Sequence, residues 1–305
     1  MSVRAAAVLV IVLLWITPCG AARRLNLLGA PLFESGALML MAQEDVFARL
    51  GYETHFIPWR SPDQYRAMLL SGQADILVIS ALEYTRLRKA LPDLNLLFSV
   101  AGTPLWLLGS AGDIRLEELR GKRLALPFRG DMPELTLRLL LRNSPVNMAD
   151  VRLVSGGGAV SSAQLVMTGD ADFVMIAEPL AAMMVNLSHA QNRGRPLHYA
   201  LDLNRLWHQR NPQGPPLLLS HIVARDLPKA VSELFQRLYP AYVERCRNRP
   251  RQCAALFCHY FPSLSQSEVE RFLATTPLRI LPAAEIKAPL CRFLDLVEEA
   301  SDEAL

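Results

Sequence analysis

The segment 128–131 (Phe-Arg-Gly-Asp) holds charged groups suited to binding a small anion. A guanidinium can chelate two oxygens of a carboxylate, sulfonate or phosphate, so Arg129 is the leading candidate for a ligand-binding cation. In the alternative, Arg129 pairs with Asp131 or Glu134 and serves the scaffold. Asp131 either contacts ligand or caps a helix expected to begin near Pro133. This segment indicates binding chemistry.

Other residues offer complementary ligand contacts. Trp59 and Phe128 could sandwich a flat ligand, or pack beneath a loop. The triplet 156–158 (Gly-Gly-Gly) allows close backbone approach to an anion, or forms a plain strand-to-helix turn. Glu178 accepts hydrogen bonds from an amine or ring nitrogen, or stabilises an interface between lobes. For His221 we expect a structural role.

Catalytic chemistry has little support in the sequence. It contains no G-x-S-x-G nucleophile elbow, no H-E-x-x-H metal motif, and no Ser/His/Asp set whose spacing marks a triad. We therefore expect a binding protein without a cofactor rather than an enzyme.

Four cysteines, Cys246, Cys253, Cys258 and Cys291, lie in the last quarter of the chain. In an oxidising compartment they favour one or two disulfides, with three possible pairings. Cys246 and Cys253 flank Pro250, where the chain could turn back and bring them together. The alternative, a metal site of Cys253, Cys258 and His259, matches no common zinc spacing.

The N-terminus has the three parts of a secretory signal peptide. A short basic start, 1–4, precedes an apolar run, 5–16, and a small-residue stretch, 17–22. The apolar run is shorter than the roughly 20 residues of a spanning helix. We predict cleavage after Ala22 and a periplasmic, soluble mature protein. The alternative is lipidation at Cys19, for which Pro18 is a poor preceding residue.

The length and net charge of the chain limit the classes of protein to which it can belong. The chain has 305 residues, 51% of them hydrophobic, and a formal net charge of +3 from 32 basic and 29 acidic residues. At roughly 100–200 residues per domain, this length predicts two lobes. Because no basic tail or dense Lys/Arg run is present, nucleic acid is excluded as a partner.

Hydrophobic periodicity predicts alternating strands and helices. The first half begins with a strand at 25–28, a helix at 35–50, a strand at 52–57, a helix from 61 to 70, and a strand at 74–79 that is continuously apolar after Asp75. Strands at 122–127, 151–154 and 171–176 follow, with helices at 133–141 and 159–167 between them. Continuous apolar strands are typical of a parallel sheet covered on both faces.

The two halves repeat at a single offset. Residues 72–80 (Gly-Gln-Ala-Asp-Ile-Leu-Val-Ile-Ser) match 169–177 (Gly-Asp-Ala-Asp-Phe-Val-Met-Ile-Ala) at an offset of 97, which also aligns the two earlier strands of each half. The repeat predicts two structurally equivalent α/β lobes, each a mostly parallel sheet flanked by helices.

Apolar runs at 96–101 and 105–108 are separated by Gly-Thr-Pro, and runs at 197–203 and 217–223 by a Pro-rich segment. They predict two crossings between the lobes and hinge closure over a cleft. The expected units are the signal peptide, 1–22; the first part of lobe one, 23–103; lobe two, 104–214; and a return to lobe one with C-terminal helices, 215–305.

Three segments resemble a known family. Residues 169–179, with their Gly-x-x-Asp and Glu-Pro pairs, are similar to a segment of type II periplasmic solute-binding proteins of ABC importers, in the sulfonate, nitrate, taurine and thiamine-pyrimidine branch. Residues 69–75 and 116–123 are similar to two further family segments. The resemblance covers roughly 25–227. The family commonly has a longer loop after the first strand, so ligand identity is not carried over from it.

The resemblance implies a monomer that binds a small molecule and delivers it to an ABC permease and its ATPase. The thiamine-pyrimidine relatives include an enzyme with a cysteine-rich segment and a cofactor-binding lysine, but here the cysteines lie elsewhere and no candidate is a lysine. Two alternatives stay open: a ligand-sensing lobe for a membrane receptor, and an exported enzyme on the same fold.

Ligands of parallel α/β sheets bind beyond the carboxyl ends of the strands, near helix N-termini. Applied to both lobes, this rule predicts a cleft for a small polar or anionic solute. The candidate ligand-binding residues are Phe33, Glu34, Ser35, Trp59, Ser80, Ala81, Phe128, Arg129, Gly130, Asp131, Gly157 and Glu178.

Overall fold

The computed structural model describes residues 22–142, 144–191 and 194–302. The predicted signal peptide therefore lies almost wholly outside the described residues. Within them, no helix combines the length and the apolar character needed to cross a membrane.

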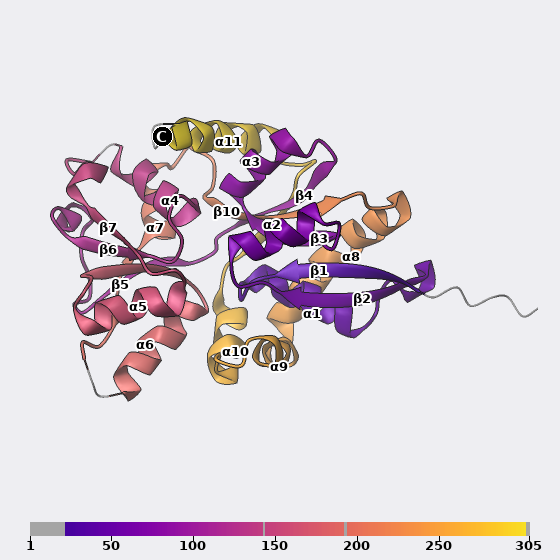
Figure 1. Cartoon of the computed structure of the whole chain (residues 1–305), viewed down its shortest axis with the longest axis horizontal. Coiled ribbons are helices and arrows are strands. Elements are labelled where there is room, and N and C mark those ends of the chain that lie inside the picture. The colour runs from indigo at the N-terminus through magenta and orange to yellow at the C-terminus, as the bar shows by residue number, and fades with distance from the viewer. Residues whose placement is uncertain (1–21, 143, 192–193, 303–305) are drawn as a thin grey trace, which may run out of the picture.

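Two sheets flanked by helices form the structure, which confirms the expected fold class (Figure 1). We call the six-stranded sheet with its helices lobe one and the five-stranded sheet with its helices lobe two. Lobe one has the strand order β11-β4-β10-β3-β1-β2, and lobe two has the order β7-β6-β8-β5-β9.

The strands of lobe one are β1 (Arg23–Gly29), β2 (Tyr52–Pro58), β3 (Ile76–Ser80), β4 (Leu94–Ala101), β10 (Leu218–Arg225) and β11 (Arg279–Pro282). Its helices are α1 (Phe33–Gln43), α2 (Pro62–Leu70), α3 (Ala81–Ala90), α8 (Lys229–Asn248), α9 (Pro250–Tyr260) and α10 (Gln266–Thr275).

The strands of lobe two are β5 (Leu105–Gly109), β6 (Arg123–Leu126), β7 (Arg152–Ser155), β8 (Phe173–Ala177) and β9 (His198–Asp202). Its helices are α4 (Met132–Leu141), α5 (Ala159–Thr168), α6 (Leu180–Ala190) and α7 (Leu203–Arg210). A last helix, α11 (Lys287–Asp302), lies against both α3 of lobe one and α4 of lobe two.

The 97-residue repeat is visible in the strands. β1, β2 and β3 end at Gly29, Pro58 and Ser80, and the ends of β6, β7 and β8 each lie 97 residues later. The pairing registers repeat at the same offset, since Leu27 pairs with Ile76 in lobe one and Leu124 with Phe173 in lobe two.

The two Asp residues that match in the repeat make the same kind of hydrogen bond in each lobe. The Asp75 carboxylate accepts a hydrogen bond from the backbone N–H of Asn26 at 2.7 Å, and Asp172 accepts one from Arg123 at 2.8 Å. Each carboxylate thus ties the start of the third strand to the first. A one-residue slip would turn the apolar side chains of a buried strand to the wrong face, so this contact helps to fix the register.

Each sheet is parallel where the repeat lies and antiparallel where the crossings add strands. β1–β2, β1–β3, β6–β7 and β6–β8 pair in parallel, whereas β10 pairs antiparallel with β3 and β4, and β5 with β8 and β9. Among the described strands, parallel pairing is therefore limited to β1, β2 and β3 in lobe one and to β6, β7 and β8 in lobe two.

The first helix is shorter than expected. α1 ends at Gln43 instead of continuing to Leu50, and a separate 3-10 turn covers Ala48–Leu50. Asp45 takes a left-handed backbone conformation with φ 44°, and its carboxylate accepts a hydrogen bond from the backbone N–H of Thr54 at 2.9 Å. The Asp45 side chain thus holds the start of β2 just beyond the end of the helix.

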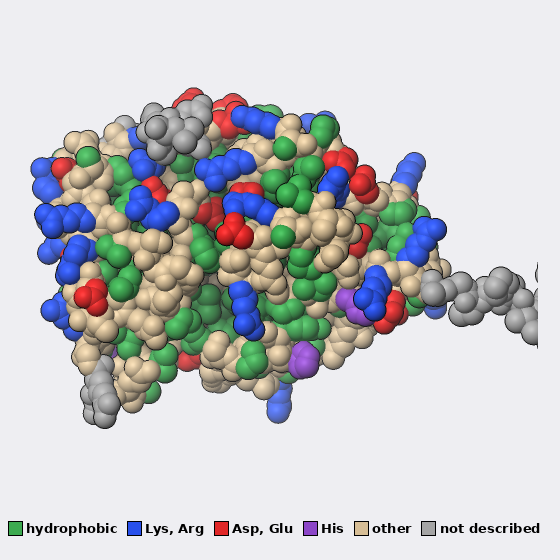
Figure 2. Space-filling model, in the orientation of Figure 1, with side chains coloured by type: hydrophobic (Ala, Val, Ile, Leu, Met, Phe, Trp, Pro, Cys, Tyr) green, Lys and Arg blue, Asp and Glu red, His purple; other side chains and the backbone are tan. Residues whose placement is uncertain are grey.

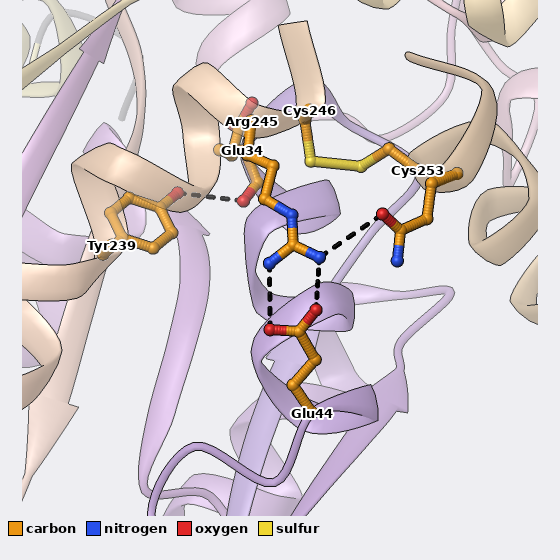
Figure 3. The surroundings of a disulfide bond; sticks show 7 residues. Glu34, Glu44, Tyr239, Arg245, Cys246 and Cys253 are labelled. Carbon is orange, nitrogen blue, oxygen red and sulfur yellow. Dashed lines mark hydrogen bonds and ion pairs between the residues drawn. A yellow bond between two sulfur atoms is a disulfide. The ribbon is translucent and has the colours of Figure 1, made fainter. Parts of the chain in front are cut away.

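A disulfide between Cys246 and Cys253 joins α8 to α9, as the turn at Pro250 suggested (Figure 3). Both helices pack on α1. A Cβ added at Gly36 of α1 would lie 2.7 Å from Cys253 Sγ, so only glycine fits beside the disulfide. Nearby, Arg245 of α8 pairs with Glu44 at the end of α1. The segment from α8 to α9 thus supports the helix whose N-terminus lies near the cleft.

Candidate ligand-binding site

The two lobes enclose a cavity of about 410 Å³ at the carboxyl ends of their equivalent strands. This volume lies within the range of roughly 300–1,000 Å³ that is typical of small-molecule sites. Lobe one contributes residues after β1 and β2, the end of β3, part of β10, and the turn between α9 and α10. Lobe two contributes the loop after β6, the first turn of α5 and the end of β8.

Four of the predicted ligand-binding residues line this cavity: Trp59, Ser80, Phe128 and Asp131. The Trp59 indole packs edge-on against Tyr65 with ring centroids 4.9 Å apart, and its N–H donates to the carbonyl of Val78 at 3.1 Å. The ring is thereby held by the scaffold while one side of it lines the cavity.

Ser80 and Asp131 join the two lobes directly. Ser80 Oγ donates to Asp131 Oδ1 at 2.5 Å, and the same hydroxyl accepts a hydrogen bond from the N–H of Glu83 at 3.2 Å, so it caps α3. Asp131 caps α4 by accepting a hydrogen bond from the N–H of Met132 at 2.7 Å. Burial raises the pKa of Asp131 above its ordinary value, although the hydrogen bond from Ser80 opposes this shift.

Arg129 takes the scaffold alternative. Its Nε donates to Glu134 Oε2 at 2.8 Å, and Arg129 is not among the residues that line the cavity. Glu134 also accepts hydrogen bonds from Arg138 and from the N–H of Gly130. Three donors therefore converge on one buried carboxylate. Gly130 has a positive φ of 68° and likewise lies outside the cavity wall.

The predicted residues Phe33, Glu34 and Ser35 lie behind the cavity wall, which residues 30–32 form after β1. Phe33 is buried with its ring edge-on to Phe272, and Ser35 is buried beneath Gly29. Glu34 is fully buried, and one of its carboxylate oxygens accepts a hydrogen bond from the Ser220 hydroxyl. Because Ser220 lines the cavity, Glu34 is separated from that space by one side chain. Burial raises the pKa of Glu34.

Three further candidates are placed elsewhere. Ala81 is buried in the first turn of α3, and Gly157 precedes the cavity-lining Gly158 without lining the cavity itself. Glu178 lines a second, larger concavity of about 1,100 Å³ between α10 and lobe two. There its carboxylate accepts hydrogen bonds from the Tyr199 hydroxyl at 2.7 Å and from the N–H of Ala182 at 3.0 Å.

His221 is fully buried, and its ring packs edge-on against Tyr84 with centroids 5.4 Å apart. Burial lowers its pKa to about 3, so the imidazole is neutral at physiological pH. The ring therefore packs as a core side chain.

Some cavity residues were not among the predicted candidates. Phe261 and Ser263 come from the turn between α9 and α10, and Ser220 comes from β10. The N-terminal turn of α5 also lines the cavity through residues 159–161. The rule of strand ends does not find Phe261 or Ser263, because they reach the cleft from helices that follow the second crossing.

Among the described residues, no group of three or more His, Cys, Asp or Glu side chains is arranged to hold a metal ion. The metal alternative for the cysteines is overturned for Cys253, which is in the disulfide, while Cys258 donates to the carbonyl of Leu264.

No protein-family model and no curated protein matches the chain. Solved structures do match. A ligand-binding component of an ABC-type import system from Staphylococcus aureus, with zinc bound, shares 15% identity, covers 91% of each chain and has a TM-score of 0.69. The alkanesulfonate-binding protein SsuA from Xanthomonas axonopodis pv. citri, bound to MOPS, shares 18% identity over 92% of this chain and 94% of that chain, with a TM-score of 0.68.

A third match is PhnD1 from Prochlorococcus marinus in complex with methylphosphonate. It shares 12% identity over 93% of this chain and 98% of that chain, with a TM-score of 0.60. These likenesses confirm the two-lobe periplasmic-binding-protein architecture that the resemblance implied. At such identities they concern the fold.

Proposed function

We propose that this protein is the exported substrate-binding component of an ABC importer. In this proposal it is a periplasmic monomer that captures a small solute between its two lobes and presents it to a permease and ATPase. The observation that carries the proposal is the cavity at the carboxyl ends of both sets of repeated strands, with the Ser80–Asp131 hydrogen bond at its wall. The fold shared with ligand-binding components of importers supports it.

The mechanism follows from a site divided between two bodies. A solute that contacts both lobes has its full set of contacts only when the lobes are closed, so binding shifts the population toward the closed state. The chain crosses between the sheets at 102–104, between β4 and β5, and at 211–217, before β10. Two short crossings permit hinge rotation with little change inside either lobe.

Arg129 was the leading candidate cation for an anionic solute, and its guanidinium is engaged by Glu134. The proposed function requires only that a solute bridges the lobes, and it does not depend on that cation. It also assigns no chemical step to the protein.

The test is to purify the protein from its native periplasm, denature it, and identify the released small molecules by mass spectrometry. Readdition to the refolded protein should raise the melting temperature, because a ligand that binds only the folded state stabilises it. Ala177→Phe, which places a ring in the cavity, should abolish the shift. Ala182→Phe, at a half-buried alanine of the larger concavity, is the matched control.

Chemical conversion of the released solute by the purified protein would contradict the proposal and support the enzyme alternative. A melting temperature that responds to no released solute would also contradict it.

A further inference from the structure

The cavity wall is largely apolar and carries several rings. Trp59, Phe128 and Phe261 contribute aromatic surface, and Ile176, Leu180 and Leu219 contribute aliphatic surface. These side chains come from both lobes. A wall of this kind stabilises the flat, apolar part of a ligand by burying its surface and by ring stacking.

The cavity wall holds little cationic charge. Arg129 is paired with Glu134, and among the described residues that line the cavity only Arg60 is basic, at an exposed position. Figure 2 shows basic side chains gathered along the outer edge of lobe two. A buried sulfonate or phosphonate needs charge-assisted partners to offset its lost hydration. Besides this exposed guanidinium at the rim, the cavity offers an anion the backbone N–H groups in the first turn of α5, which has no side-chain cap.

Acceptor groups, by contrast, lie at or just behind the wall. Asp131 Oδ1 is engaged by Ser80 and Met132, whereas in the described part of the chain Asp131 Oδ2 has no hydrogen-bond partner. Glu34, behind Ser220, has a buried Oε2 that is also without a partner among the described residues. An anionic ligand would meet these carboxyl groups unfavourably, whereas a ligand donor would satisfy one of them.

We propose that the cleft binds a ring-bearing, mostly apolar solute that carries a hydrogen-bond donor, as a hydroxyl or amino group, and no anionic group. The ring lies among Trp59, Phe128 and Phe261, and the donor faces Asp131 Oδ2. This proposal rests on the proposed function, because it assigns a class of solute to the same cleft.

A matched pair of fluorescent probes tests the proposal. N-phenyl-1-naphthylamine is uncharged, aromatic and carries one N–H donor, and 8-anilino-1-naphthalenesulfonate is the same skeleton with a sulfonate. Fluorescence titration should give an affinity at least about tenfold higher for the uncharged probe. Methylation of its nitrogen, which removes the donor, should weaken binding severalfold, as expected for one hydrogen bond.

Variants locate the probe. Ala177→Phe should weaken binding of N-phenyl-1-naphthylamine at least about tenfold, and Ala182→Phe should change it less than twofold. Val160→Trp, at an exposed position of the wall, is a second blocking variant that places no new side chain in the core. Thermal melts of each variant confirm folding before titration.

Three results would overturn the proposal: binding of the sulfonated probe as tightly as the uncharged one, binding of the uncharged probe that neither blocking variant affects, and no binding of either probe. If the sulfonated probe binds as tightly as the uncharged one and the blocking variants abolish that binding, the proposed function still holds. The solute would then belong to the anionic class. The proposed function is tested separately, by the solute released from the native protein.

Discussion

Ser80 Oγ and Asp131 Oδ1 lie 2.5 Å apart, one at the end of β3 in lobe one and the other at the start of α4 in lobe two. Each residue also caps the helix that follows it. A second contact lies beside them, since Arg86 Nη1 donates to the carbonyl of Gly130 at 3.1 Å. Two helix N-termini thus meet across the cleft, and one of the polar contacts between the lobes is made by their capping residues.

Ser80→Ala should affect both the helix cap and the contact between the lobes. We expect a loss of about 1 kcal/mol in the free energy of unfolding from the lost cap. We also expect a larger mean distance between the lobes without ligand, because Asp131 loses its partner from lobe one. Chemical denaturation measures the first effect. The second is measured by the distance between spin labels at Gln73→Cys and Arg152→Cys, two exposed positions, in a Cys258→Ser, Cys291→Ser background.

Ser61→Ala is the matched control for this prediction. Ser61 caps α2 by accepting a hydrogen bond from the N–H of Gln64 at 3.3 Å, entirely within lobe one. It should lose similar stability and leave the distance between the labels unchanged. Equal distances in Ser80→Ala and wild type would show that the Ser80–Asp131 contact does not bias closure.

Arg129→Ala should leave probe binding within about twofold of wild type, since the guanidinium faces Glu134 instead of the cavity. Its stability should fall by about 1 kcal/mol, the size of one hydrogen bond lost by a carboxylate that keeps Arg138 and the N–H of Gly130. Titration with N-phenyl-1-naphthylamine and denaturation measure the two effects. A tenfold or greater loss of affinity for any cleft ligand would return Arg129 to the site.

Removal of the disulfide should destabilise the protein by about 2 kcal/mol. The Cys246→Ser, Cys253→Ser variant opens a short loop of sequence separation 7, for which chain entropy predicts a loss of this size. Because Gly36 of α1 packs against the two sulfurs, local protection from hydrogen exchange should fall in α1 as well as in α9. Cys291→Ser, at an exposed cysteine, is the control. Unchanged exchange in α1 would contradict a supporting role for the disulfide.

The buried carboxyl group of Glu34 should make the folded protein less stable as pH rises. Its pKa is raised above 4.5 in the folded protein by burial, so the folded state binds the proton more tightly than the unfolded chain. Stability is therefore greatest below the unfolded pKa and declines as pH rises from about 4.5 through the folded pKa. Glu34→Gln cannot ionise and should remove this decline. At low pH the Glu34→Gln variant should be less stable than wild type by about 1–3 kcal/mol, because the amide group replaces a carboxyl group without gaining a partner. Denaturation across pH measures both, and parallel curves for variant and wild type would contradict the assignment.

Glu44→Gln gives a control of opposite sign. The hydrogen bond with Arg245 lowers the pKa of Glu44, so its contribution is present above the unfolded pKa and disappears as pH falls through the folded value. The pair is partly exposed, and its loss should cost less than about 1 kcal/mol.

The repeat was the most informative feature of the sequence. Its offset of 97 residues reproduces the ends of three strands in each lobe, because buried parallel strands have continuous apolar runs that are hard to misplace. The Asp75 and Asp172 positions matched for a reason that only the structure shows, namely their hydrogen bonds to the first strands. Helix α3 was not among the predicted elements, although Ser80 and Glu83 have the spacing of a capping box.

The predicted strand ends located the cleft, but they did not predict which way individual side chains point. Arg129 and Glu134 are five residues apart, and whether that arginine faces a ligand or a carboxylate depends on the rotamer and on Arg138 behind it. Phe261 reaches the cavity only because the disulfide-linked helices return to lobe one. Such contacts depend on tertiary packing between distant segments, which periodicity does not encode. Which cleft residues bind the solute stays a prediction.

The distance between labels at Gln73→Cys and Arg152→Cys, with and without the solute released from the native protein, tests the central claim most directly. Closure on ligand predicts a distribution that shifts to shorter distances at saturation, and no shift when Ala177→Phe fills the cavity. An unchanged distribution at saturating solute would contradict the account, because it would show that the two lobes do not close on what they bind.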